Sequence, residues 1–163
     1  MQETDTLKSN RLALTALLLW VITIVVFAWI FVRGNTGERT DGRTAIVLTA
    51  GERELVLSEM RGLLSAIHAI LEGVNRGDMK HIADSSRSVG TQGAIDESPA
   101  LMAKLPLGFK ALGMGVHHDM DEIANAADRG QPVSKLLNMT SNVLAKCVAC
   151  HSSWQIYTGN KLQ

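Results

Sequence analysis

A run of 21 residues without a charged side chain, from Leu12 to Val32, constrains the fold of this chain more than any other feature of the sequence. Arg11 and Arg33 stand directly at its two ends. A helix rises ~1.5 Å per residue, so this run is long enough to cross the roughly 30 Å hydrocarbon core of a bilayer. The sequence therefore predicts a single transmembrane helix, residues 12–33, near the N-terminus.

A cleaved secretory signal is the alternative interpretation of this run. Such a signal has an apolar core of about 7–15 residues, followed by a cleavage site of the small-x-small type. The run here is longer, and the residues from Phe31 to Asn35 contain no such site. We therefore expect an uncleaved signal anchor, preceded by a short segment, residues 1–11, with Trp29 near enough to one end for an interfacial position.

The second informative feature is Cys147-Val148-Ala149-Cys150-His151, which contains the only two cysteines of the chain. C-x-x-C-H is the attachment sequence of c-type haem, in which two thiols add to the porphyrin vinyl groups and the imidazole becomes an axial iron ligand. On a helix, residues three and four apart share a face, so all three side chains can serve one macrocycle. The sequence predicts one covalently attached haem c on Cys147 and Cys150, with His151 as a ligand of the iron.

The C-x-x-C-H motif is also compatible with three kinds of site that hold no haem. A thioredoxin-like C-x-x-C belongs in a βαβ context, whereas the surrounding residues have a helical pattern. A disulfide between the two cysteines leaves His151 without a role. A structural zinc ion needs a fourth ligand, which His117 or His118 would have to supply from a distant segment.

The orientation of the anchor does not follow from charge alone. Lys8 and Arg11 precede the span, and Arg33, Arg39 and Arg43 follow it, so neither flank has a clear excess of positive charge. Covalent haem attachment, which the motif implies, takes place on the outer face of the bacterial inner membrane. We therefore expect a single-pass protein of that membrane, with its N-terminal segment in the cytoplasm and its haem domain in the periplasm.

The remainder of the chain is predicted to be a linker, residues 34–44, and one domain, residues 45–163. The linker contains three glycines, and the domain is of ordinary single-domain size. The chain has 16 basic and 16 acidic residues, so it lacks the basic excess that nucleic-acid binding requires. No nucleic-acid partner is expected.

Helical periodicity dominates this domain. Thr49 and Glu52 form a capping-box signature before an apolar pattern of helical spacing. Helices are expected over residues 50–75, 78–89, 106–128 and from Pro132 through the motif, with a turn over 101–105. No segment alternates over strand length, so we predict an all-α domain, a four-helix bundle with haem between facing helices. The predicted buried stripe of the last helix comprises Val133, Leu136, Leu137, Thr140, Val143, Leu144, Cys147 and His151.

With this motif near the end of its last helix, the chain resembles the class II c-type cytochromes, the cytochrome c′ and cytochrome c-556 family. The resemblance covers about Ala45 to Tyr157 and implies a periplasmic four-helix bundle, although the membrane anchor is unlike the usual soluble members. Where the family commonly continues with Tyr-Arg, this chain has Trp154 and Gln155. The resemblance implies a stacking role at the haem for Trp154, whereas Gln155 cannot make the ion pair with a haem propionate.

The function depends on what occupies the iron coordination position opposite His151. An open position permits binding of small gases, whereas a methionine thioether closes it and favours the reduced iron. Met60 lies at about the depth of His151 in an antiparallel bundle, but Met114 and His117 fall at similar depths. The resemblance favours Met60 as the iron ligand, with core filling as the alternative. His117 and His118, with their acidic neighbours, are expected on a solvated helix face, and only one of the two can face the core.

Together these features predict an electron carrier rather than an enzyme. The expected protein is a membrane-tethered periplasmic mono-haem cytochrome that carries single electrons between respiratory or photosynthetic redox partners, or that serves as a subunit of a larger membrane complex. The alternative is a cytochrome c′ that binds NO or CO at an open sixth position of the iron.

Overall fold

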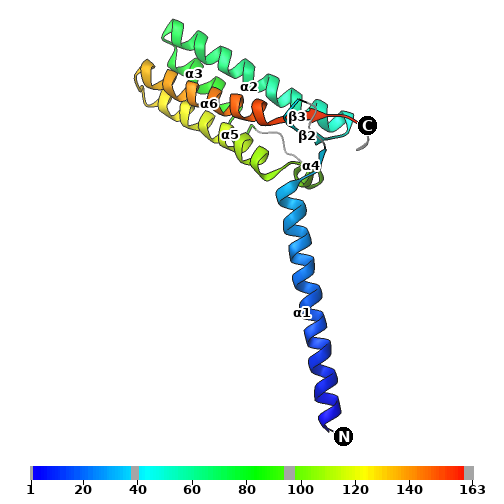
Figure 1. Ribbon diagram of the computed structural model, residues 1–163. Coiled ribbons are helices and arrows are strands. Elements are labelled where there is room, and N and C mark those ends of the chain that lie inside the picture. The colour runs from blue at the N-terminus through cyan, green and yellow to red at the C-terminus, as the bar shows by residue number, and fades with distance from the viewer. Residues whose placement is uncertain (1, 38–40, 94–97, 160–163) are drawn as a thin grey trace.

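The computed structural model describes residues 2–37, 41–93 and 98–159, and this part of the chain is mostly helical (Figure 1). Six helices and three short strands are present in these residues. The helices are α1 (Gln2–Arg33), α2 (Ala50–Arg76), α3 (Met79–Arg87), α4 (Pro99–Lys104), α5 (Leu107–Asp128) and α6 (Val133–Ser153). The strands are β1 (Thr36–Gly37), β2 (Thr44–Val47) and β3 (Trp154–Tyr157).

Helix α1 projects away from the other helices, which lie together at its C-terminal end (Figure 1). Its apolar side chains between Leu12 and Val32 are exposed. Within the described residues, this is the one helix long and apolar enough to cross a membrane, as the sequence predicts. An exposed apolar surface of this length is stable in lipid and not in water.

The helices of the domain agree closely with the predicted ones. The capping box that begins α2 is confirmed: the Thr49 hydroxyl accepts from the Glu52 amide, and the Glu52 carboxylate accepts from the Thr49 amide at 2.9 Å. Helix α3 packs against both α2 and α5, and α6 packs against α5. The largest side chains buried between them are Ile70, Ile82, Met120, Ile123, Leu136 and Val143.

The predicted buried stripe of α6 is only partly right. Leu136, Thr140 and Val143 are buried, but Leu137, Leu144 and His151 are exposed. Helix α5 is the helix that approaches α6 most closely, and it covers only one side of it. The apolar positions on the other edge of the stripe therefore remain in contact with solvent.

The three strands were not expected from the sequence, which predicted a linker after the anchor and then an all-α domain. They form one sheet in the order β1-β2-β3, with β2 antiparallel to β1 and parallel to β3. Strands of two and four residues are too short to show an alternating pattern. The sheet joins the chain that follows the anchor to the chain that follows the C-x-x-C-H motif, with Thr44 opposite Trp154.

The first residues after α1 are held by the domain. Gly34 has a φ of 65°, and a Cβ atom there would lie 2.5 Å from the carbonyl oxygen of Lys104. The Asn35 amide donates to that same oxygen at 2.6 Å, and the Asn35 side chain donates to the carbonyl oxygen of Val47 at 2.8 Å. The predicted linker, residues 34–44, therefore begins with a close contact between the anchor and α4.

Candidate functional site

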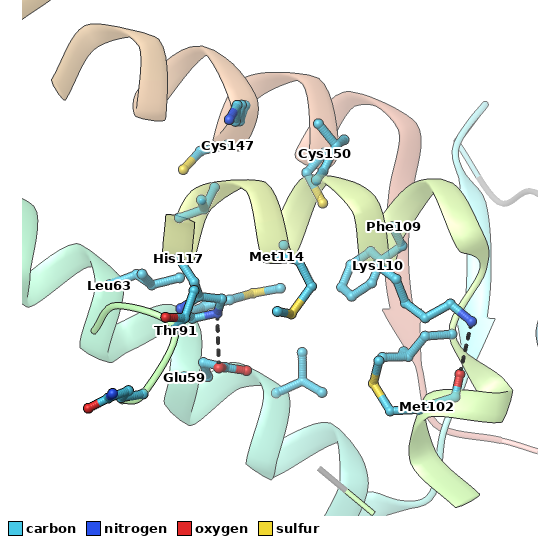
Figure 2. Close-up of a pocket in the computed structure, with 18 residues that line it drawn as sticks. Glu59, Leu63, Thr91, Met102, Phe109, Lys110, Met114, His117, Cys147 and Cys150 are labelled. Atoms are coloured by element: carbon cyan, nitrogen blue, oxygen red, sulfur yellow. Dashed lines mark hydrogen bonds and ion pairs between the residues drawn. The ribbon is translucent and has the colours of Figure 1, made fainter. Parts of the chain in front are cut away.

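A cavity of about 610 Å³ lies among α2, α5 and α6 at the end of the domain nearest to α1 (Figure 2). This volume falls within the range of roughly 300–1,000 Å³ that is typical of ligand and cofactor sites. Its apolar lining comes from α2, from α5 and from the region of α4. The apolar residues are Val56, Met60, Leu63, Met102, Leu105, Phe109, Leu112, Met114 and Val116.

The two cysteines line this cavity from α6 (Figure 2). Both are free thiols and partly buried. Burial raises the pKa of Cys147, and burial with the nearby charge of Cys147 raises the pKa of Cys150 to about 11. Catalytic dithiols need a lowered pKa, because the thiolate is the reactive form. The raised pKa values of the two thiols therefore favour a structural role over thioredoxin-like chemistry.

His151, the predicted iron ligand, lies beside the cavity rather than in its lining. The residue is in the last turn of α6 and is exposed. Its carbonyl oxygen accepts a hydrogen bond from Arg43 at 3.2 Å. Four residues after Cys147, the imidazole is displaced by about 40° around the helix from that thiol. The thiols thus face the cavity, whereas the imidazole lies at the solvent-exposed edge of the same helix face.

The structure brings together all three candidates for the opposite iron ligand. Met60 from α2 and both Met114 and His117 from α5 line the cavity. Met60 is partly buried and packs with the apolar residues around it, whereas Met114 is 50% exposed. Of the two thioethers, Met60 is thus the one better shielded from water.

His117 is only 6% exposed, so the prediction of a solvated face is wrong for this residue. Its Nδ1 donates to the carbonyl oxygen of Val89 at 2.8 Å, and its Nε2 lies 3.2 Å from Oε1 of Glu59 (Figure 2). His118 is exposed, which confirms that only one of the two histidines faces the core. Glu59 belongs to another helix, so no local pattern revealed this pair. Both ring nitrogens of His117 are engaged, which makes it a poorer candidate for an iron ligand than Met60.

Two lysines line the cavity, and neither was predicted from the sequence to be a site residue. The ammonium of Lys146 is 2.6 Å from the carboxylate of Asp119. Lys110 is 8% exposed, and its ammonium donates to the carbonyl oxygens of Phe31 and Met102, each at 3.2 Å. Burial lowers the pKa of Lys110. A lysine in an amphipathic helix is ordinarily a surface residue, so its sequence position carried no signal.

Trp154 is placed in β3 and does not line the cavity. Its ring packs edge-on against Phe109, with the ring centroids 6.0 Å apart and the planes at 90°. Phe109 does line the cavity. Trp154 therefore contacts the site through the aromatic wall rather than directly. Gln155, in the next position, lies 3.4 Å from the carboxylate of Asp41.

The side chains around the cavity include groups that a cofactor could use. Among the described residues, no group of three side chains of His, Cys, Asp or Glu is placed to hold a metal ion. Two thiols on one helix face, an apolar cavity and a thioether on the facing helix match what a macrocycle requires. The exposed His151 would have to turn toward the cavity to complete this set.

Comparison with known proteins finds no match for the chain among protein-family models, curated proteins or solved structures. Its function has to be inferred from its own residues.

Proposed function

We propose that this protein is a membrane-tethered, periplasmic c-type cytochrome with one haem c, and that it carries single electrons between redox partners. The observation that carries this proposal is the position of Cys147 and Cys150. They are the only cysteines of the chain, they precede a histidine with C-x-x-C-H spacing, and they line an apolar cavity of cofactor size. Helices α2, α3, α5 and α6 are the four-helix bundle that we propose for the haem.

The proposed roles follow from the residues around the cavity. Cys147 and Cys150 would hold the porphyrin through their sulfur atoms, and His151 would bind the iron once its side chain faced the cavity. Met60 would supply a second iron ligand from α2, with a sulfur atom that favours the reduced state. Phe109 and Trp154 form the aromatic wall beside α6. When bound, the haem supplies a reversible one-electron couple, and the apolar lining keeps water from it.

The proposed location is the bacterial inner membrane, spanned once by α1. The Arg33 guanidinium lies 5.5 Å from the centre of the Trp29 ring, at the end of α1 next to the domain. Tryptophan and arginine are typical of the interface between lipid and water. With residues 1–11 in the cytoplasm, the haem domain is confined to the periplasmic surface. There it meets membrane-bound respiratory or photosynthetic partners, or belongs to one such complex.

The attachment of the haem can be tested with the full-length protein. It is produced in a bacterium that has the haem-attachment machinery and is purified in mild detergent. We expect one haem per chain that stays with the polypeptide in acidified acetone. Replacing both thiols (Cys147→Ala with Cys150→Ala) should release the pigment, whereas Ser141→Ala, an exposed position on the same helix, should not. A colourless wild-type protein, or one that loses its pigment in acid, would contradict the proposal.

The same preparation separates electron transfer from gas binding. A low-spin ferrous protein whose spectrum does not change with carbon monoxide supports the electron carrier. Met60→Ala should then produce a high-spin site that binds the gas, with Met114→Ala as the control from the opposite wall. A high-spin wild-type protein that binds carbon monoxide would instead identify the alternative, a gas-binding cytochrome c′ with an open sixth position.

A further inference from the structure

The charged side chains around the cavity are not equivalent. Glu59 lies 3.2 Å from His117, and Lys146 lies 2.6 Å from Asp119. Lys110 is the most buried of the lining lysines, yet no acidic side chain of residues 11–37, 41–93 or 98–159 forms an ion pair with it. Buried charges are normally paired, because an uncompensated charge in an apolar environment is costly. The positive charge of Lys110 is thus unusual for its position.

Backbone dipoles compensate this charge in part. The carbonyl oxygens of Phe31 and Met102 belong to the last turns of α1 and α4, where helix dipoles place partial negative charge. The ammonium also lies 3.8 Å from the centre of the Phe31 ring. An ammonium has three N–H donors, and the two carbonyl groups account for two of them. One donor remains, and no acidic side chain of residues 11–37, 41–93 or 98–159 pairs with the net charge.

Figure 2 shows how Lys110 is placed relative to the other lining residues. Lys110, Phe109 and Met102 lie at one end of the cavity, whereas Glu59, His117 and Thr91 lie at the other. Met114 and Cys150 lie between these ends, whereas Leu63 and Cys147 lie toward the end of His117. Lys110 is therefore the lining lysine that has no acidic partner among the described side chains, and it lies at the end of the cavity next to α1.

We infer that Lys110 binds a carboxylate of the molecule that occupies the cavity. The site then selects a macrocycle with carboxylate groups, oriented with an acidic edge toward α1 and the membrane. This inference rests on the proposed function, because the haem of that proposal carries two propionate carboxylates. A carboxylate at Lys110 would replace the water that burial removes from the ammonium, and a charge-assisted hydrogen bond is among the stronger ones.

The test uses the full-length chain, produced without the attachment machinery and purified in detergent. It is titrated with haem and with haem dimethyl ester, in which both carboxylates are blocked, and binding is followed by absorbance. We expect haem to bind roughly tenfold more tightly than the ester, the size expected for one hydrogen bond to a charged group. Lys110→Met should weaken haem binding to the level of the ester and leave ester binding unchanged.

Two further variants provide the controls. Lys110→Arg keeps the charge and should retain the preference for the free acid. Lys135→Met removes an exposed lysine of α6, whose ammonium contacts Gln131, and should change neither affinity. Circular dichroism checks that each variant is folded. Should Lys110→Met fail to fold, the preference of the wild-type protein and of Lys110→Arg still decides the question.

The outcomes distinguish this inference from the proposed function. A wild-type chain that binds the ester as tightly as haem, or binds neither, overturns the role of Lys110. Equal haem affinity in wild type and folded Lys110→Met does the same. Covalent pigment in the matured protein, measured separately in acidified acetone, decides the proposed function irrespective of these affinities.

Discussion

The same helices make two different interiors along the length of the domain. In the half far from α1, side chains such as Ile70, Ile82 and Ile123 are fully buried and fill the space between the helices. In the half next to α1, helices α2, α5 and α6 enclose the cavity instead (Figure 2). Helix α3, which packs against both α2 and α5, is only nine residues long and ends at Arg87. Beyond its end, no helix of the described residues continues in its place, and Thr91 and Gln92 of the following segment line the cavity.

This difference indicates that the half far from α1 contributes most of the stability, whereas the half next to α1 contains the candidate site. Close-packed interiors lose free energy when a side chain is truncated, because the surrounding structure collapses only in part. Residues that line an open cavity have fewer packing partners to lose. Substitutions in the two halves should therefore separate effects on folding from effects on binding.

The largest expected effect is a truncation in the filled half. Ile123→Ala should lower the free energy of unfolding by about 2–5 kcal/mol, because the side chain is fully buried. The matched truncation in the cavity half, Met114→Ala, should cost about 1 kcal/mol or less, because that side chain is half exposed. Urea unfolding of the full-length chain in mild detergent, followed by circular dichroism, gives both values. Equal losses at the two positions would show that the halves do not differ in packing.

The joint between the anchor and the cavity half should be the next most sensitive place. Gly34→Val adds a side chain where the backbone has a positive φ and where a Cβ atom would meet α4 and the start of α5. Gly42→Val is the matched control, since Gly42 also has a positive φ, of 88°, but no atom lies within 4 Å of its Cβ position.

Opening of this joint can be measured by the rate of trypsin cleavage after Arg33. We expect Gly34→Val to raise that rate roughly tenfold, which corresponds to about 1.4 kcal/mol of local opening. Gly42→Val should change it much less, because only backbone strain is added. Similar rates in both variants would indicate that the contact of Gly34 with α4 contributes nothing to the joint.

An effect of similar size is expected from the buried pair between α2 and α5. His117→Leu removes the partner of Glu59 and the donor to Val89, which should cost about 1–3 kcal/mol in the free energy of unfolding. His118→Leu, at the neighbouring exposed position, should cost less than about 0.5 kcal/mol. Urea unfolding of the two variants compares them directly, and a larger loss for His118→Leu would reverse our assignment.

The smallest effect concerns the pH dependence of the unloaded chain. The folded state raises the pKa of Cys150 from 9.0 to about 11, so the neutral thiol is the form that the fold favours. Stability from this group is therefore complete below about pH 9 and decreases as the pH rises toward 11. Because the thiol is only partly buried, we expect a loss of about 1 kcal/mol. Cys150→Ser should reduce this loss, and an unchanged pH profile in that variant would assign it to another group.

Local patterns in the sequence were sufficient for the helices and for the position of the thiols. The charge-free run predicts α1, the capping box predicts the start of α2, and the spacing of Cys147 and Cys150 places both on one face of α6. These features depend on residues within a few positions of one another, and helical geometry relates such residues directly.

Contacts between distant segments were decided by the packing of the whole chain. The pairing of β2 with β3, the contact of His117 with Glu59 and that of Lys110 with Phe31 each join residues far apart in the sequence. Depth along a helix left Met60, Met114 and His117 equivalent, and the folded chain distinguishes them by exposure and by hydrogen bonds. The physical reason is that periodicity gives the face of a single helix, whereas which faces meet, and where space remains between them, depends on every element that packs there.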